Sequence, residues 1–495
     1  MSVDISSGYL AKFGSLMGAT EPALKLLLTL IAGYPLALIY RKYVCGKNEN
    51  LQHLFFALSG FLLGYWNYGM DMLHCVFAIF FTYCTLLLLN GTITSVAITF
   101  VFNLSYLLIG YYYTSTNTYD IIWTMPQCIL VLRLIGIAYD YYDGRQPLDT
   151  LSSENKKVAL TKRPGLLEIF GHCFFPSSFL IGPQFPLKRY QEFVAGSYGR
   201  MDVPNTPPDS VNASMKMLAL GVLYLTVFQV LGVFVSDEYM LSEDFRNLNF
   251  FRKMLLLGIW GRFTLYRYIS CWLLTEGACI LFGITYNGKN EHGETQWNGL
   301  ENIKISIFEN TTEFNHYIQS FNVNTNHWVA QYVYKRLKFL GSRQVSQLVA
   351  LLFLALWHGL HSGYYICFLF EFIVIYMERD IKSIVKNNAT LANLFGSAKI
   401  QLPLQILLRI YTFVFMGWCL LPFSLLKFER YWTAFRNVNY VGIILFGLWP
   451  FIYSPILKYL LNQRKTYMDP DNDNLGACRV CAQSTKISWQ FNYNA

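Results

Sequence analysis

Apolar runs of membrane-spanning length recur along the whole chain, and short polar stretches separate them. A helix needs about 20 predominantly apolar residues to cross the hydrocarbon core of a bilayer. The runs therefore predict an all-α polytopic membrane protein with about 10–12 transmembrane helices, some of them tilted or broken. The expected helices lie at about 23–44, 51–69, 72–90, 92–113, 121–139, 166–183, 214–235, 250–284 (one helix or two), 345–357, 362–377, 403–426 and 438–460.

The polar stretches between these runs are too short to fold as separate soluble domains. Residues 1–465 are therefore expected to form one membrane domain, which a polar tail at 466–495 follows. No internal repeat is visible, and its absence disfavours a transporter built from inverted repeats. The internal polar stretches lie at 144–165, 186–212, 286–316 and 378–400.

The composition agrees with this interpretation. Of the 495 residues, 54% are hydrophobic and only 14% are charged, against about 25% charged in an ordinary soluble domain. The formal net charge of +9 comes from Lys and Arg residues that lie largely between the apolar runs, where they set topology and attract anionic headgroups or substrates. Because no soluble domain carries a concentrated basic face, we do not expect nucleic-acid binding.

Two segments differ from plain lipid-facing helices. The first, 301–341, is amphipathic and contains Tyr332-Val-Tyr-Lys-Arg-Leu-Lys-Phe339, which is typical of an interfacial helix with its cations at headgroup level. The second, 182–190, contains Pro183 and Pro186. Two prolines so close together break a helix and indicate re-entrant or cavity-lining backbone.

His358 is the histidine with the most unusual setting. It follows seven apolar residues, 351–357, and is flanked by Gly359 and Gly363, which allow close helix packing or the approach of a ligand. An ionisable group at membrane depth is costly and is by default a functional candidate. A hydrogen-bonded structural histidine is the alternative that the spacing alone leaves open.

No metal site is expected. His358 and His361 lack a carboxylate or a cysteine at a suitable spacing, and the CxxC pair in the tail, Cys478 and Cys481, lacks a second pair.

The segment around His358 also carries a family resemblance. Trp357-His-Gly-Leu-His-Ser-Gly-Tyr-Tyr-Ile-Cys-Phe368 resembles the WHGxxxGYxxxF signature of the membrane-bound O-acyltransferase family and matches it at every fixed position. Upstream, Ser320-Phe-Asn-Val-Asn-Thr-Asn-His-Trp328 is similar to the block that precedes the histidine in lysophospholipid acyltransferases of that family. The resemblance is strongest to the arachidonoyl-preferring lysophosphatidylcholine acyltransferases and is weakest after about residue 380. It includes Asp140-Tyr-Tyr-Asp-Gly144, Gly182-Pro-Gln184 and Thr275-Glu-Gly-Ala-Cys-Ile280.

The resemblance implies a catalytic Asn and His pair in a chamber within the bilayer. The histidine corresponds to His358. Asn322 is the expected partner because the family places its asparagine after the phenylalanine that begins the block, whereas Asn324 and Asn326 are interpreted as caps or packing groups. Acyl-CoA would be a co-substrate and no cofactor is implied. The implied location is the endoplasmic reticulum membrane, and a homo-oligomer stays open.

The implied reaction transfers a polyunsaturated acyl group from acyl-CoA to the sn-2 hydroxyl of lysophosphatidylcholine, and also of lysophosphatidylethanolamine or lysophosphatidylserine. These residue types suit that chemistry. Imidazole, with a reference pKa near 6.5, can take the hydroxyl proton at neutral pH. An asparagine amide can donate a hydrogen bond to a developing oxyanion or hold the reacting groups in place.

Five further residues are predicted to bind or position substrate. Lys335, Arg336 and Lys338 suit the phosphates of the acyl donor, although a positive-inside flank would also explain them. Trp328 suits stacking on adenine. Glu276 is a carboxylate in an apolar run, and we expect it to shape the chamber or to bond to a neighbouring helix.

Two other functions stay open at this point. A transporter or channel would use His358, Glu276 and Asn322 to line a polar pathway. An acyltransferase with a different acceptor, such as a sterol, diacylglycerol or a protein, would keep the chemistry. Consumption of a lysophospholipid by solubilised protein in the presence of acyl-CoA would distinguish both from the main prediction.

Overall fold

The computed structural model describes residues 5–16, 18–116, 121–198 and 208–467. The tail cysteines Cys478 and Cys481 lie outside these residues. Within them the chain is helical, and its extended pairings are two isolated bridges, Lys289 with Thr295 and Ile303 with Phe321.

Six of the described helical stretches are long and apolar enough to cross a membrane, which confirms the predicted all-α polytopic membrane fold. One of them, of 41 residues, consists of α3 (Glu49–Tyr68) and α4 (Met72–Leu89), which a single 3₁₀ turn at Gly69–Asp71 separates. The expected helices outside these six are shorter or more polar. The six stretches are Glu21–Val44, Glu49–Leu89, Ile93–Thr114, Ser210–Leu241, Ala398–Leu425 and Ile443–Leu461.

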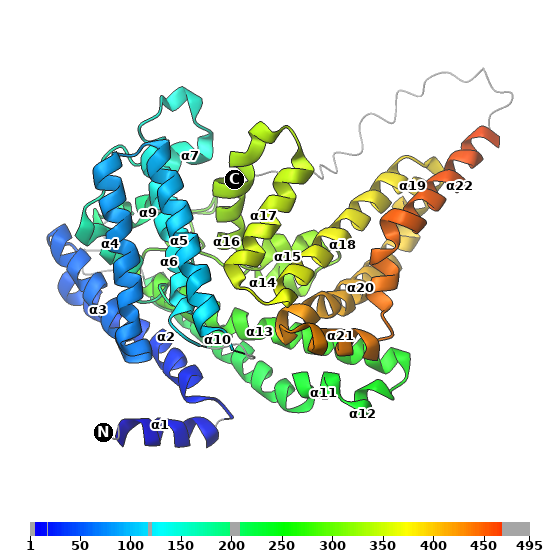
Figure 1. The fold of residues 1–495 in the computed structure, drawn as a ribbon, viewed down its shortest axis with the longest axis horizontal. Helices are drawn as coiled ribbons and strands as arrows, with labels where there is room; N and C mark the ends of the chain where they lie inside the picture. The colour runs from blue at the N-terminus through cyan, green and yellow to red at the C-terminus, as the bar shows by residue number, and fades with distance from the viewer. Residues whose placement is uncertain (1–4, 17, 117–120, 199–207, 468–495) are drawn as a thin grey trace.

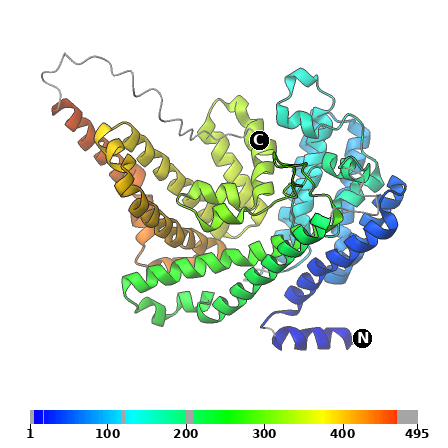
Figure 2. The same cartoon turned by 180° about the vertical axis from the view of Figure 1, so that it is seen from behind.

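The helices form two groups, and the segment that carries the predicted site lies between them (Figures 1 and 2). The first group contains α2 (Glu21–Ile39), α3 (Glu49–Tyr68), α4 (Met72–Leu89), α5 (Ile93–Thr114), α6 (Thr124–Asp143), α8 (Leu166–Cys173) and α9 (Leu187–Val194). The second contains α18 (Ser362–Lys386), α19 (Ala389–Gly396), α20 (Ala398–Leu425), α21 (Phe428–Asn437) and α22 (Ser454–Tyr467). Between them lie α14 (Ile305–Glu309), α15 (Phe314–Ser320), α16 (Val323–Val329) and α17 (Arg343–His358).

Two long helices, α10 (Pro208–Phe234) and α13 (Phe250–Phe282), pack together and run from one group to the other. Asn249 caps the start of α13 by accepting a hydrogen bond from the backbone of Arg252 at 3.0 Å, and Gly283, with a φ of 99°, ends the helix. No proline interrupts the 33 residues between these caps. The run at 250–284 is therefore one helix.

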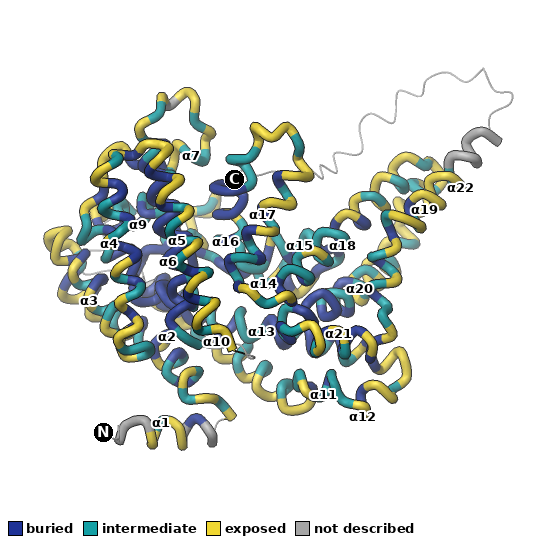
Figure 3. The backbone as a smooth tube through the Cα atoms, viewed as in Figure 1, coloured by how far each residue is buried: buried dark blue, intermediate teal, exposed yellow. Residues whose placement is uncertain are grey.

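Three clusters of buried apolar side chains hold these helices. Figure 3 colours the backbone by burial, and buried residues occur in both helix groups and in the segment between them. One cluster lies in each helix group. The third joins α5 and α6 to the segment between the groups, α14 to α17, which is called the central segment below. This third cluster contains residues such as Leu107, Ile135, Trp328 and Trp357. Thus α16 and α17 are packed against the first group, whereas α14 and α15 contribute Phe308, Phe314 and Tyr317 to the cluster of the second group.

The predicted helix at 166–183 is wrong. The helix α8 ends at Cys173, and the backbone from 174 to 186 is non-helical and largely buried before α9 begins at Leu187. Arg133 of α6 lies fully buried against this segment. Its guanidinium donates to the carbonyls of His172 at 2.6 Å and Cys173 at 3.0 Å, and to the hydroxyl of Ser178 at 2.7 Å. Non-helical backbone is tolerated at membrane depth where protein groups satisfy it.

The crossing of α13 and α20 depends on two glycines. A Cβ on Gly261 would collide with the Cα of Gly417, and a Cβ on Gly417 would collide with the carbonyl of Leu257.

We expect Gly261→Val to push the helices apart and destabilise the fold by about 1–3 kcal/mol, which a lowered unfolding temperature of the solubilised protein would reveal. Gly232→Val is the matched control, because the space around Gly232 is open. Equal unfolding temperatures for the two variants would contradict this packing.

Candidate active site

His358 is the last residue of α17, and its neighbours fix the end of that helix. The indole nitrogen of Trp357 donates to the carbonyl of Cys128 at 2.9 Å, and the hydroxyl of Tyr111 donates to the carbonyl of Trp357 at 2.8 Å. Because these partners lie on α5 and α6, the end of α17 is attached to the first helix group.

The two glycines of the motif turn the chain immediately after His358. Gly359 has a φ of 141°, which an L side chain rarely adopts, and it ends α17. The amide of Gly363 donates to the carbonyl of Leu426 at 3.0 Å, and a Cβ at Gly363 would collide with the carbonyl of Pro422. The start of α18 thus lies directly against the end of α20. Both glycines are needed to place His358 between the two groups.

Aromatic rings surround the imidazole of His358. Its ring centroid lies 4.7 Å from that of Trp357, 5.7 Å from Tyr364, 5.5 Å from Phe368 and 5.1 Å from Phe423. The residue is nevertheless only half-buried. No hydrogen bond joins its ring nitrogens to any residue in the described ranges, so they remain accessible to a bound hydroxyl.

The other membrane histidines differ in this respect. A ring nitrogen of His53 lies 2.9 Å from the hydroxyl of Tyr190, and one of His74 lies 2.6 Å from the hydroxyl of Tyr106. A ring nitrogen of His172 lies 3.0 Å from the carbonyl of Phe185. Each of these histidines has one ring nitrogen in a hydrogen bond to the protein, as a structural histidine does, whereas the contacts of His358 do not support that alternative.

Asn322 occupies the N-cap of α16 in the left-handed conformation, with φ 51° and ψ 45°. Asparagine is one of the few residues other than glycine that adopt this region readily. The side-chain oxygen of Asn322 accepts a hydrogen bond from the amide of Asn302 at 3.3 Å. Within the described part of the chain its amide nitrogen has no acceptor, so this donor is left for a ligand.

The two competing asparagines use their amide nitrogens to hold backbone. That of Asn324 donates to the carbonyls of Leu300 at 3.2 Å and Glu301 at 3.1 Å. That of Asn326 donates to the carbonyls of Ile318 at 3.0 Å and Phe321 at 2.9 Å. This difference favours Asn322 as the asparagine that acts on substrate.

One aromatic cluster connects Asn322 with His358. Phe321, which precedes Asn322, has its ring centroid 6.4 Å from that of Tyr268 on α13. Tyr268 in turn lies 6.5 Å from Phe423, the ring that contacts His358. The two predicted catalytic residues therefore belong to neighbouring walls of the same region, although 35 residues separate them in the sequence.

The same cluster includes Trp272 of α13. Its ring centroid lies 4.8 Å from that of Phe321, and its indole nitrogen donates to the carbonyl of Ile181 at 3.1 Å. The segment that contains Gly182-Pro-Gln184 is thereby joined to the site.

Glu276 is buried on α13, and its carboxylate accepts a hydrogen bond from the backbone of Asn302 at 3.4 Å. Asn302 also contacts both Asn322 and Asn324 through its side chain. Glu276 thus supports the segment that positions Asn322. Sequence reasoning missed Asn302, which lies in a polar stretch that carries no motif.

Two of the predicted cations, Lys335 and Arg336, have acidic partners on α7 (Ser153–Val158) and at the end of α6. Lys335 forms an ion pair with Glu154. Arg336 makes two hydrogen bonds to the carboxylate of buried Asp143, at 2.9 and 2.5 Å. The hydroxyl of Tyr332 donates to Asp140 at 2.6 Å. The blocks 140–144 and 332–336 are therefore docked together.

Lys338 and Trp328 have opposite surroundings. Lys338 is exposed. Trp328 is only 2% exposed and stacks on Phe353 with ring centroids 5.5 Å apart. In this packing the indole of Trp328 contributes to the core, and a role in adenine stacking stays a prediction. Binding of the acyl donor by Lys335, Arg336 and Lys338 also stays a prediction.

A metal centre finds no support in the residues that the structure describes, since no group of three or more His, Cys, Asp or Glu side chains in them could hold an ion.

The family model described as "MBOAT, membrane-bound O-acyltransferase family" matches residues 108–422. This range includes every predicted site residue, and the chain belongs to this family. It is similar to proteins named lysophospholipid acyltransferase 5. It is 40% identical to that of Mus musculus over 456 residues (92% of this chain and 93% of the relative) and 44% identical to that of Drosophila melanogaster over 454 residues (90% of each). The Caenorhabditis elegans protein of that name is 33% identical over 456 residues, which cover 92% of this chain and 96% of the relative.

Proposed function

We propose that the protein is an acyl-CoA-dependent lysophospholipid acyltransferase that acts within the endoplasmic reticulum membrane. The observation that carries the proposal is a pair of groups without a hydrogen-bond partner in the described chain, the imidazole of His358 and the side-chain amide nitrogen of Asn322, beside one aromatic cluster. Membership of an acyltransferase family favours this function over a transporter with a polar pathway. The names of the similar proteins favour a lysophospholipid as the acceptor.

In the proposed reaction His358 is the general base. It takes the proton of the sn-2 hydroxyl as that oxygen attacks the thioester carbonyl of the acyl donor. Asn322 donates a hydrogen bond to the oxyanion that forms. The C–S bond then breaks, the imidazolium returns the proton to the leaving thiolate, and the products are free CoA and a diacyl phospholipid.

An acceptor panel tests the proposal. Purified protein is supplied with arachidonoyl-CoA and, separately, with lysophosphatidylcholine, lysophosphatidylethanolamine, lysophosphatidylserine, cholesterol or diacylglycerol, and release of free CoA is measured. We expect turnover with the lysophospholipids and the highest rate with lysophosphatidylcholine. Turnover with only the sterol or only diacylglycerol would show that the enzyme catalyses the same reaction on a different acceptor, and the predicted lysophospholipid acceptor would be wrong.

Lys338 provides a test of donor binding. Since its ammonium is exposed, we expect Lys338→Ala to raise KM for acyl-CoA several-fold and to leave kcat nearly unchanged, because a phosphate contact far from the thioester binds substrate and transition state about equally. Lys399→Ala, which removes an exposed lysine at the start of α20, is the matched control. A lower kcat at an unchanged KM would contradict the predicted role.

A further inference from the structure

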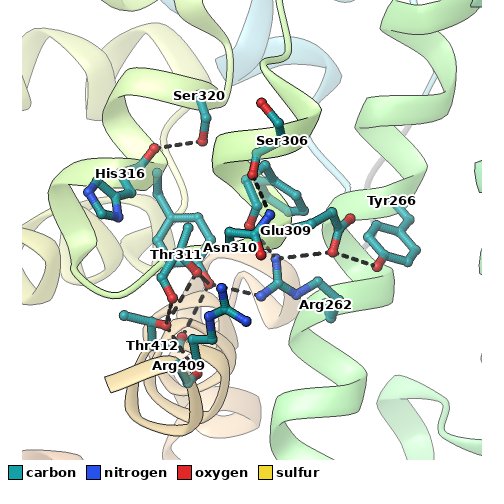
Figure 4. A network of polar contacts seen from close by, with 12 residues as sticks. Arg262, Tyr266, Ser306, Glu309, Asn310, Thr311, His316, Ser320, Arg409 and Thr412 are labelled. Carbon is teal, nitrogen blue, oxygen red and sulfur yellow. Dashed lines mark hydrogen bonds and ion pairs between the residues drawn. The ribbon is translucent and has the colours of Figure 1, made fainter. Parts of the chain in front are cut away.

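A second polar site lies between α13, α20 and the loop after α14. It is a cavity of about 350 Å³ lined by Arg262, Tyr266, Glu309, Thr311, Arg409 and Phe413, among others. In Figure 4, Arg262 and Arg409 extend from their two helices toward the same space, beside Glu309 and Thr311. The lining thus holds two guanidinium groups and one carboxylate, a net charge of +1.

The carboxylate of Glu309 is already engaged by protein groups. It accepts hydrogen bonds from the hydroxyls of Tyr224 at 2.9 Å and Tyr266 at 3.3 Å, and it lies 3.9 Å from the guanidinium of Arg262. Arg262 also donates to the carbonyl of Phe308 at 3.0 Å. Glu309 and Arg262 therefore offset each other's charge, and the excess positive charge of the cavity is that of Arg409.

Arg409 has an unusual place for a charged residue. It is the twelfth of the 28 residues of α20 (409 − 398 + 1), about 17 Å from the start of the helix at 1.5 Å per residue. Three apolar side chains near it on this helix, those of Ile406, Leu407 and Ile410, are more than half exposed. Arg409 itself is exposed, and in the described ranges no hydrogen bond or ion pair of its guanidinium is found.

An arginine on the lipid-facing surface of a membrane helix is costly unless an anion compensates it. In a bilayer the abundant anion is the phosphate of a phospholipid, and guanidinium groups match its oxygens well. The apolar rim, with Ile410 and Phe413 in the lining, suits the lipid that carries this phosphate. The cavity also lies within the size range of small-molecule sites.

We propose that this cavity binds a phosphate ester, that of a phospholipid drawn from the bilayer, with Arg409 as the cationic ligand open to lipid and Arg262 as the inner one. The site is separate from the catalytic pair but close to it. The guanidinium of Arg262 lies 4.7 Å from the ring centroid of Phe308, which stacks on Phe321 at 5.9 Å, and Phe321 precedes Asn322. One aromatic layer therefore separates the bound phosphate from the catalytic wall.

Binding to the full chain, purified in detergent, tests this site without any readout of turnover. Native mass spectrometry measures the affinity for dioleoyl phosphatidylcholine and for dioleoylglycerol, which has the same chains and no phosphate. We expect wild-type protein to prefer phosphatidylcholine and Arg409→Gln to bind it about tenfold more weakly, the loss of one charge-assisted contact. Arg409→Lys keeps the charge and should retain most of the affinity. Lys399→Gln, on the same helix outside the cavity, should bind like wild type.

A third ligand, free CoA, identifies the source of the phosphate. If Arg409→Gln weakens the binding of CoA but does not change the affinity for phosphatidylcholine, the phosphate ester belongs to the acyl donor. The proposal that a membrane phospholipid supplies it would then be wrong. If wild-type protein binds dioleoylglycerol as tightly as phosphatidylcholine and Arg409→Gln binds all three ligands normally, the cavity is not a phosphate site. Because phosphatidylcholine is also the product of the proposed reaction, the comparison of the Arg409 variant with Lys399→Gln assigns the binding to this cavity, and Arg409→Met replaces Arg409→Gln if that variant does not fold. Because the readout is binding, an inactive preparation would contradict the proposed function alone.

Discussion

His358→Ala should abolish acyl transfer while the protein still extracts from membranes as a single folded species. Positioned general-base catalysis contributes about 10²–10⁴ in rate, and no described residue near the imidazole is placed to replace it. Because His358 makes no hydrogen bond to the described chain, its removal should cost little stability. Release of free CoA at saturating acyl donor and lysophosphatidylcholine is the measurement.

His361→Ala is the matched control for that variant. His361 lies three residues further along, and one of its ring nitrogens lies 3.1 Å from the hydroxyl of Ser115. Removing it tests whether loss of any histidine in this turn disturbs α18. If His358→Ala kept a tenth of wild-type turnover, or if His361→Ala alone were inactive, His358 would not be the base.

Loss of the Asn322 side chain should lower kcat rather than weaken the binding of acyl-CoA. Loss of one preorganised oxyanion donor costs about 10²–10³ in kcat, so a measurable residual rate should remain, with little change in KM for acyl-CoA. Alanine is a poor probe here because Asn322 has a positive φ. Asn322→Gly removes the amide and keeps that backbone conformation, and its kcat is the quantity to measure.

The variants Asn324→Ala and Asn326→Ala test whether these asparagines take part in catalysis or only stabilise the fold. Both side chains hold backbone carbonyls, so we expect these variants to lower the unfolding temperature more than Asn322→Gly does. If Asn324→Ala or Asn326→Ala folded normally and lost activity while Asn322→Gly was silent, the register would be shifted by two or four residues and the oxyanion donor would be a different asparagine.

The apolar pattern was sufficient to predict the all-α membrane fold, because a spanning helix must be apolar over a fixed length. It failed at 166–183, where an equally apolar stretch is mostly non-helical. Burial in lipid and burial in protein select the same residue types, so composition does not distinguish them. The decisive group is Arg133, which is 45 residues from Ser178 in the sequence but 2.7 Å from its hydroxyl.

The candidate site likewise has features that could be predicted from the sequence and features that could not. The motif around His358 could be identified from sequence because its glycines and aromatic rings are local to the turn they build. The partners of Lys335 and Arg336 could not, since Glu154 and Asp143 lie 181 and 193 residues away along the chain. The support that Glu276 gives to Asn322 through Asn302 was hidden for the same reason.

The docking of 140–144 against 332–336 has a consequence for chimaeric enzymes assembled from this chain and its relatives. A chimaera that exchanges only the first six helices sets one parent's counterpart of Asp143 opposite the other parent's counterpart of Arg336. Wherever the two parents differ there, a carboxylate that is 1% exposed in this chain would lose its partner, at a cost of about 3–5 kcal/mol. Donor segments intended to transplant substrate preference should therefore carry both blocks or neither.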